Sequence, residues 1–501
     1  MSSTNALVFK VERSQPELVV PIKPTPQEWK QLSDIDDQEG FRCQFSMIQF
    51  YRNNPSMEGR DPVKVIKEAV AKTLVFYYPF AGRIREGFGR KLFVECTGEG
   101  ILFIEANVNV TIEQFEDSLQ PPFSCIDELL YNVPNSDGIL DSPLLFIQVT
   151  RLKCGGFIFA IRFNHAMMDC FGMVQFMRAI AEMARGALAP SILPIWQRDI
   201  LCARDPPRVT CHHLEYDQVD HDIIGTMIPL KNMVERSFFF GPTEISIIRE
   251  SLPIHFRSCS SPELLTIFIW RLRTIALQLN QDEEVCLLCL VNLRTKFNIF
   301  PLGYYGNAVA LPAAFTTAGK LSQNSLGYAI ELVEKTKTKV TEEYMKSMVD
   351  LMVMKGRPHF SVVRSLLVAD LTEAGFEEVD YGWGKAIYGG PVSGGVGLVP
   401  DGFGMAQFMM AIAEMARGAL APSVLPVWQR ALLSGRDPPR VTCLHLEYDQ
   451  VDHDIEGTMV PFKNMTQCYG IELVEKAKAK VTEEYMKSMG GFDGDERATP
   501  L

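Results

Sequence analysis

The fold is decided by the stretch Gly155-Gly-Phe-Ile-Phe-Ala-Ile-Arg-Phe-Asn-His-Ala-Met-Met-Asp-Cys-Phe-Gly172. Its first half alternates large apolar side chains with smaller or polar ones, which predicts a half-buried strand over residues 157–164. From Phe171 to Arg185 the apolar residues follow helical spacing, and Gly186 stands where such a helix would end. A strand that passes directly into a helix predicts a mixed fold of α-helices and β-strands.

The junction between that strand and that helix carries His165 and Asp169. A histidine side chain has an ordinary pKa of about 6.5, so it is mostly neutral in the cell and can accept a proton from a hydroxyl group. A histidine at the end of an apolar strand can also be a buried side chain with a structural hydrogen bond. The position of His165 alone leaves both interpretations open.

Other segments extend the mixed pattern. Asp61-Pro62 can cap a helix, because apolar residues follow it at helical spacing. The runs 91–95 and 101–105 flank Gly98-Glu-Gly100, which predicts a hairpin. The polar segment 204–222 is expected to connect two halves of the chain.

The positions of cysteine and histidine do not indicate a metal centre. Cys286-Leu-Leu-Cys289 has no second cysteine pair at zinc spacing, so we expect a core strand there. His212-His213 and His221 lie among acidic residues, but in a polar connection with no enforced geometry. We therefore expect no bound metal.

The chain has 501 residues, a formal net charge of −12 and a pI near 5.3. This acidity argues against nucleic acid as the main partner, because phosphate binding uses an excess of Lys and Arg. Residues 1–10 lack the pattern of a signal peptide, and no apolar run approaches the roughly 20 residues that span a membrane. We expect a cytoplasmic protein without a membrane partner, whose 12 cysteines are reduced.

The last hundred or so residues are a spliced copy of earlier sequence. Residues 169–233 recur as 401–465, and residues 327–348 recur as 468–489. So long and nearly verbatim a copy differs from the short, diverged units of repeat proteins, and it indicates a recent duplication or a fused gene model. It holds no second site, because Gly397 stands where His165 would be. We expect a loosely packed tail that leaves a sheet edge uncovered.

Four motifs occur in the order that one enzyme family uses. They are Asn164-His-Ala-Met-Met-Asp-Cys-Phe-Gly172, Asn292-Leu-Arg294, Pro301-Leu-Gly-Tyr-Tyr-Gly-Asn307 and Asp380-Tyr-Gly-Trp-Gly384. The first resembles the HxxxD motif of the plant BAHD acyltransferases, and the last resembles their DFGWG motif with Tyr381 in place of Phe. The resemblance covers about residues 7–400 and is strongest to the alcohol acyltransferase subgroup.

The resemblance implies an α/β (α+β) fold with two chloramphenicol acetyltransferase-like domains and an active-site channel between them. The expected parts are an N-terminal domain at 1–200, a crossover connection at 201–236, a truncated C-terminal domain at 237–400 and the copied tail at 401–501. It also implies a monomeric enzyme that makes esters from acyl-CoA, as co-substrate, and a small alcohol. No permanently bound cofactor is expected.

The resemblance further implies roles for single residues. His165 would be the general base that deprotonates the alcohol. Asp169 would turn from the channel toward an arginine, although its spacing from His165 also allows an orienting contact. Asp380 would pair with Arg294, and Trp383 would pack beside the channel or simply in the core. The remaining motif residues would support these groups: Gly172, Asn292, Gly382 and Gly384.

Two residues depart from the family pattern. Ala369 lacks the hydroxyl that a serine there would offer to an oxyanion, a loss that can cost roughly 10²–10³ in rate. Glu373 is negative where an arginine is expected, which either disfavours anionic CoA or changes a surface pair. Two alternatives to alcohol acylation therefore stay open. One is a hydroxycinnamoyl or amine acyltransferase of the same family, and the other is a catalytically silent paralogue or fusion product.

Overall fold

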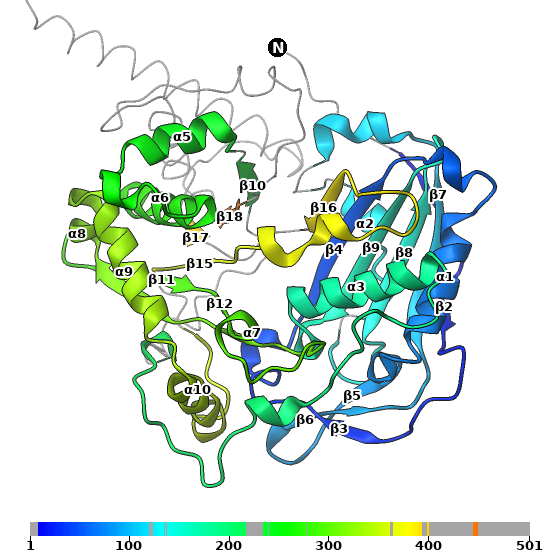
Figure 1. Ribbon diagram of the computed structural model, residues 1–501, viewed down its shortest axis with the longest axis horizontal. Helices are drawn as coiled ribbons and strands as arrows, with labels where there is room; N and C mark the ends of the chain where they lie inside the picture. The colour runs from blue at the N-terminus through cyan, green and yellow to red at the C-terminus, as the bar shows by residue number, and fades with distance from the viewer. Residues whose placement is uncertain are drawn as a thin grey trace, which may run out of the picture. The chain divides into compact units, whose positions relative to one another are not determined.

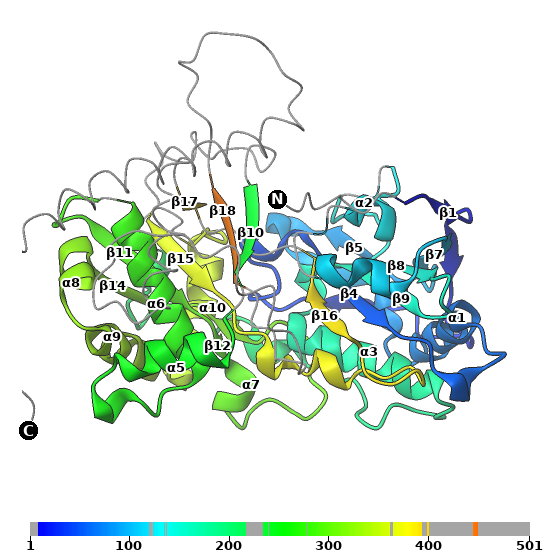
Figure 2. The same cartoon turned by 90° about the horizontal axis from the view of Figure 1, so that it is seen from above.

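The protein is described here from a computed structural model (Figures 1 and 2). The structure describes residues 9–119, 123, 125–134, 136, 138–216, 234–238, 240–277, 279–360, 364–392, 398–399 and 444–448. Within these ranges, every helix is too short or too polar to cross a membrane.

The described residues form two compact units. The first comprises those within 1–226, 288–314 and 334–395, and the second comprises those within 227–287, 315–333 and 396–501. Helices and strands occur together in each unit, which confirms the predicted mixed fold. The domain boundaries near residues 200 and 237 stay a prediction.

A seven-stranded sheet forms the centre of the first unit (Figure 1). Its order is β1-β7-β8-β9-β4-β16, and β2 also pairs with β7. The strands are β1 (Val11–Arg13), β2 (Glu17–Val19), β4 (Gln44–Tyr51), β7 (Ile101–Val108), β8 (Leu145–Arg151), β9 (Phe157–Asn164) and β16 (Tyr388–Pro391). Neighbouring strands are antiparallel, except that β7 and β8 are parallel with Leu102 opposite Phe146.

Strand β9 lies inside this sheet and is buried on both faces. Its two sets of apolar residues enter different core clusters: Phe157, Phe159, Ile161 and Phe163 in one, and Ile158 and Ala160 in the other. Only Arg162 is partly exposed, so the predicted half-burial is wrong. The second face is covered by residues around the 3₁₀ segment Ile112–Ser118 and the short helix α2 (Ile126–Leu129), which alternation within one strand cannot reveal.

Two helices cover the other face of the sheet. Helix α1 (Pro62–Thr73) begins as predicted at Asp61, whose carboxylate accepts a hydrogen bond from the Val63 amide at 3.2 Å. Helix α3 (Cys170–Ala184) begins at Asp169 and ends just before Gly186, which confirms the predicted helix. Their buried side chains join the odd-numbered residues of β9 in one cluster.

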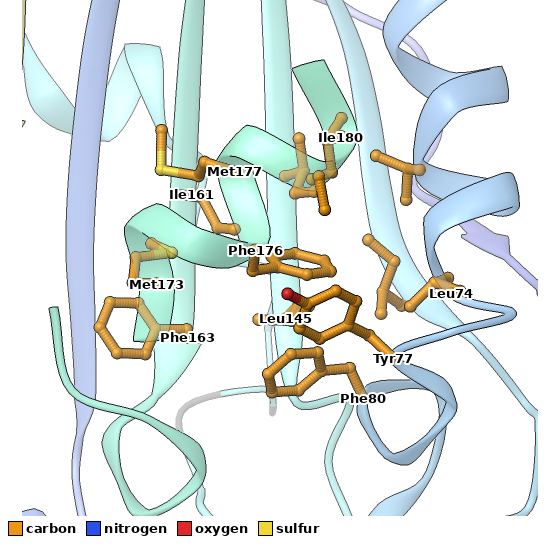
Figure 3. Close-up of a cluster of buried hydrophobic side chains, with 14 of the residues drawn as sticks. Leu74, Tyr77, Phe80, Leu145, Ile161, Phe163, Met173, Phe176, Met177 and Ile180 are labelled. Carbon is orange, nitrogen blue, oxygen red and sulfur yellow. The ribbon is translucent and has the colours of Figure 1, made fainter. Parts of the chain in front are cut away.

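Aromatic side chains fill the space between α3 and the sheet. Tyr77, Phe80 and Phe176 lie against one another (Figure 3), and the ring of Phe176 is 5.1 Å from that of Tyr77 and 4.9 Å from that of Phe80. All three side chains are fully buried. This packing fixes α3, and with it the segment that carries His165, against the sheet.

Removing this contact should destabilise the protein strongly. The substitution Phe176→Ala leaves a cavity beside Tyr77 and Phe80, and the free energy of unfolding should fall by about 3–5 kcal/mol. Urea unfolding followed by fluorescence measures this loss. Phe88→Ala is the matched control, because Phe88 is fully exposed and its removal should leave stability unchanged. Equal effects of the two substitutions would contradict the packing role of Phe176.

The predicted hairpin between residues 91–95 and 101–105 is wrong. Strand β6 (Leu92–Glu95) lies between β3 (Trp29–Gln31) and β5 (Arg83–Glu86) in a separate three-stranded sheet. Strand β7 joins the central sheet instead. The glycine-containing turn between β6 and β7 therefore moves the chain from one sheet to the next. A local turn pattern does not distinguish these two outcomes.

The second unit contains helices and a small sheet. Helix α6 (Ser261–Ala276) packs against α5 (Pro242–Glu250) and α8 (Ala318–Gln323). The small sheet has the order β10 (Val234–Phe238), β18 (Leu444–Tyr448) and β17 (Leu398–Val399). The other elements along the chain are divided between the two units: β11 (Glu284–Cys289), β12 (Val291–Asn292), α7 (Leu293–Lys296), β13 (Val309–Ala310), β14 (Ala313–Thr317), α9 (Leu326–Thr338), α10 (Glu342–Met354) and β15 (Ser365–Val368). Strand β11 is buried at Cys286 and Cys289, which confirms the predicted core strand.

Strand β18 is the described part of the copied tail. It pairs antiparallel with β10, with Val234 opposite Tyr448, and parallel with β17. Its sequence copies residues 212–216, where the structure has a 3₁₀ turn over Leu214–Tyr216. The rest of 401–501 and Gly397 lie outside the described residues, so the loose packing expected for the tail stays a prediction.

Candidate active site

His165 begins a short turn at the end of β9. Asn164 is the last residue of the strand, and its side-chain oxygen accepts a hydrogen bond from the Ala166 amide at 3.1 Å. The amide of His165 itself donates to the Cys43 carbonyl at 2.8 Å. The resulting 3₁₀ turn, His165–Met167, holds the backbone of His165 on both sides.

Aromatic rings surround the half-buried imidazole of His165. The ring of Phe41 stacks on it at 4.4 Å and is nearly parallel, with an interplanar angle of 4°. The rings of Phe45 and Phe163 each lie 6.0 Å away. Burial in this apolar setting lowers the pKa of His165 from its ordinary value of 6.5. The side chain is therefore a neutral imidazole at neutral pH, which is the form a general base requires.

Asp169 is buried and faces Arg294. Its carboxylate accepts from the Arg294 guanidinium at 2.7 and 3.1 Å and from the Ala308 amide at 3.0 Å. It also caps α3 through the Gly172 amide at 3.0 Å. These donors occupy both carboxylate oxygens, whereas Nδ1 of His165 has no hydrogen-bond partner. The orienting contact with His165 is therefore not formed, and Asp169 turns toward an arginine.

Arg294 ties Asp169 to the segment 304–306. Its Nε donates to the Tyr304 carbonyl at 3.1 Å, and its Nη2 donates to the Gly306 carbonyl. Asn292 caps the short helix that carries Arg294 by accepting from the Arg294 amide at 3.1 Å. The motif residues Asn292 and Arg294 thus come together with Asp169.

Gly172 allows α3 to approach the same segment. A Cβ atom at this position would lie 2.1 Å from the Tyr305 carbonyl oxygen, which is a severe clash with backbone. A glycine is therefore required where α3 passes Tyr305. Gly172 belongs to the scaffold around Asp169 and Arg294.

The predicted pairing of Asp380 with Arg294 is wrong. Oδ1 of Asp380 accepts from the amides of Gly382 and Gly384, each at 2.7 Å. These two glycines have φ values of 112° and 91°, and this left-handed backbone folds the loop back onto the carboxylate. Asp380 therefore stabilises its own loop, while Arg294 is engaged by Asp169.

Trp383 packs in the core of the first unit. It is 5% exposed, and its ring lies 5.3 Å from that of Phe157 on β9 in an edge-to-face arrangement. The neighbouring Tyr381, which replaces the Phe of the family motif, is fully buried against Tyr51 and Phe159. The geometry favours the packing interpretation of this motif.

Asn307 and Asp36 were not predicted from the sequence as site residues. The side-chain amide of Asn307 donates to the His165 carbonyl at 2.8 Å and to Oδ1 of Asp36 at 2.8 Å. The backbone amide of Asn307 donates to the same Asp36 oxygen at 2.9 Å. Oδ1 of Asn307 has no partner, as is also true of Nδ1 of His165. The Gly306-Asn307 pair stood in a quoted motif, but nothing in its pattern pointed to His165.

One histidine outside this site, His213, has structural contacts. His213 is buried between Glu215 at 3.1 Å and Ser347 of α10 at 2.9 Å. No group of three His, Cys, Asp or Glu side chains with metal-binding geometry occurs among the described residues, and His221 lies outside them. Ala369 and Glu373, which depart from the family pattern, are both exposed.

Known proteins match most of this chain. A model of the Transferase family matches residues 9–396. The chain is 62% identical over 426 residues to a benzyl alcohol O-benzoyltransferase of Nicotiana tabacum, which covers 84% of this chain and 92% of the relative. It is 56% identical over 398 residues to a 13-hydroxylupanine O-tigloyltransferase of Lupinus albus, with coverages of 78% and 87%.

Solved structures show the same fold at much lower identity. Vinorine synthase aligns with a TM-score of 0.60 and 23% identity, over 76% of this chain and 88% of that chain. F. graminearum TRI101 complexed with coenzyme A and deoxynivalenol aligns with a TM-score of 0.60 and 15% identity, over 73% and 89%. The family model and the close relatives confirm the resemblance seen in the motifs, and the chain belongs to the Transferase family of BAHD acyltransferases.

Proposed function

We propose that this protein transfers an acyl group from acyl-CoA to the hydroxyl of a small alcohol, with His165 as the general base. The observation that carries the proposal is the imidazole of His165 at the end of β9, which is stacked on Phe41 and has no hydrogen bond to a carboxylate. Burial lowers its pKa, which favours the neutral form. The two close relatives are named as O-acyltransferases of benzyl alcohol and of 13-hydroxylupanine. A solved relative of the same fold holds coenzyme A, which supports acyl-CoA as the donor.

The chemistry needs one base and no covalent enzyme intermediate. Nε2 of His165 takes the proton of the alcohol as its oxygen attacks the thioester carbonyl. The tetrahedral intermediate collapses, the carbon–sulfur bond breaks, and the leaving CoA thiolate takes the proton back from the imidazolium. The products are an ester and free CoA. Asp169 stays with Arg294 throughout and has no part in the proton transfer.

The rings beside His165 support an apolar, flat acceptor. Phe41 is stacked on the imidazole, and the half-buried Phe45 lies edge-on to it. Benzyl alcohol is therefore the first acceptor to test, and benzoyl-CoA is the matching donor. The wild-type protein should release CoA thiol only when the alcohol is present, with one ester formed per thiol. Thiol release without ester would indicate hydrolysis of the thioester, and the absence of both products would favour a catalytically silent protein. Either result would overturn the proposed function.

The rate should depend on pH through His165. Burial lowers its pKa, while its own backbone, the charge of Asp169, the side chain of Asn307 and the charge of Asp36 act in the opposite direction. Because burial is the larger effect, kcat/KM should be level above pH 7 and should fall in acid with an apparent pKa below 6.5. A pH profile of the benzoyl transfer measures this. An acid limb centred above pH 6.5 would contradict a buried, unpaired base.

We further propose a monomer in the cytoplasm. The ten described cysteines are free thiols, as a reducing compartment would keep them. Size-exclusion chromatography with light scattering tests the monomer.

A further inference from the structure

Asp36 is a fully buried carboxylate next to the candidate site. Its Oδ1 accepts both donors of Asn307, and its Oδ2 accepts from the Ser33 amide at 3.1 Å. Its own amide donates to the Ser33 hydroxyl at 2.9 Å, which fixes the loop that carries it. A buried carboxylate also needs a positive partner, because an isolated charge in a protein interior is very costly.

That partner is Arg198. It is 2% exposed, and its Nε lies 3.4 Å from Oδ2 of Asp36. The guanidinium lies over the rings of Trp196, Tyr304 and Tyr305 at 4.5, 5.3 and 4.9 Å. Its Nη2 donates to the Met167 carbonyl at 2.7 Å. Gly306 leaves room for this side chain, because a Cβ atom at position 306 would lie 1.1 Å from Nη1 of Arg198.

The two charged residues meet the His165 turn at both of its ends. The turn runs from His165 to Met167. Asn307, which Asp36 holds by two hydrogen bonds, donates to the carbonyl of the first residue. Arg198 donates to the carbonyl of the last residue. Hydrogen bonds that depend on one ion pair therefore fix the backbone of the turn at both of its ends.

We propose that Asp36 and Arg198 are a positioning pair that sets the orientation of His165 through Asn307 and the Met167 carbonyl. This inference rests on the proposed function, because it assigns a task to His165 that positioning improves. Both residues act through other groups, so neither is a catalytic residue.

A purely structural role would not require these charges. Replacing a buried ion pair by apolar residues of similar volume is often neutral or stabilising, so stability alone does not explain the pair. The negative charge of Asp36 also raises the pKa of His165 and so opposes the effect of burial. The charge of Asp169 acts in the same sense. Removing Asp36 should therefore change both the geometry and the basicity of His165.

The test compares Asp36→Asn with Asp37→Asn. Asp37 is the adjacent residue and is equally buried, but it pairs with Arg42 at 2.5 Å and Arg357 at 2.7 Å and has no link to the His165 turn. In Asp36→Asn, kcat for benzoyl transfer to benzyl alcohol should fall on the order of 10²-fold with KM for benzoyl-CoA unchanged. The acid limb of kcat/KM should move to lower pH. Asp37→Asn should lower thermal stability but leave kcat and the pH profile as in the wild type.

A second measurement does not depend on catalysis. The ring nitrogens of His165 are followed by ¹⁵N NMR in labelled protein, with the signal assigned by its loss in His165→Ala. The midpoint of this titration should move to lower pH in Asp36→Asn and stay in place in Asp37→Asn. If the wild type makes no ester, the proposed function fails, whereas this titration still decides the role of Asp36. An unchanged midpoint in Asp36→Asn, or a loss of kcat no larger than that of Asp37→Asn, overturns the positioning role.

A double variant covers the case in which Asp36→Asn does not fold. Asp36→Asn combined with Arg198→Met removes both charges together, so no uncompensated charge stays buried. This protein should fold and still show the fall in kcat, because the hydrogen bond from Arg198 to the Met167 carbonyl is lost. A folded double variant with the kcat of the wild type would also overturn the proposal.

Discussion

Replacing His165 with alanine should lower kcat by about 10²–10⁴-fold, the range that a general base typically contributes. The reason is that the described neighbours of the imidazole provide no second base. Asp169 is bound to Arg294, and the rings of Phe41, Phe45 and Phe163 carry no basic group. Steady-state release of CoA thiol from benzoyl-CoA with benzyl alcohol measures the effect.

The control is His255→Ala. His255 is exposed in the second unit and should be replaceable without loss of rate. The backbone of residue 165 should keep its place in the variant, because the hydrogen bond that its amide donates to the Cys43 carbonyl does not involve the side chain. Activity in His165→Ala close to that of the wild type would remove His165 as the base. It would also require another group to take the proton from the alcohol.

Replacing Arg294 with methionine should lower the free energy of unfolding by about 3–5 kcal/mol, because it leaves the carboxylate of Asp169 buried without its charged partner. Asp169 is buried and the Arg294 side chain is only 16% exposed, so little water is available to compensate. The substitution also removes the hydrogen bonds that Arg294 donates to the carbonyls of Tyr304 and Gly306. Urea unfolding measures the change.

The matched control is a surface ion pair. Lys67 contacts Glu17 at 2.5 Å, but the two side chains are 38% and 45% exposed. Lys67→Met should therefore cost no more than about 1 kcal/mol. A loss in Arg294→Met as small as that of the control would show that the Asp169–Arg294 pair does not hold the site together. Asp169→Asn in the Arg294→Met background should recover part of the stability, since the unpaired charge is then removed.

The local elements around His165 could be predicted from the sequence. The strand before it and the helix after it follow from the spacing of apolar residues, and both occur within a residue or two of the expected limits. The direction of Asp169 toward an arginine also followed from the motif resemblance. The strand and the helix depend on short segments whose own pattern determines them, whereas the direction of Asp169 was implied only by the resemblance.

Partner choice over long sequence separations could not be predicted. Asp380 and Arg294 both belong to motifs, but two positive-φ glycines turn the Asp380 loop onto itself and leave Arg294 to Asp169. The same limit applies to the link from Asp36 to Asn307, which joins residues 271 positions apart. Such contacts are decided by how separate elements pack, and a single sequence carries no local signal for them.

The residues 212–216 and their copy at 444–448 differ only at the first position, yet they adopt different backbones. At residues 212–216 the chain is held by two side chains of α10. Ser347 accepts hydrogen bonds from the Thr210 and Cys211 amides and contacts His213. Asp350 accepts hydrogen bonds from the Arg204 and Arg208 amides. At residues 444–448 the copied segment is a strand that pairs with β10. The copied block stops before Asp350. The copied segment thus lacks neighbours that shape the original, and the same residues adopt another backbone conformation.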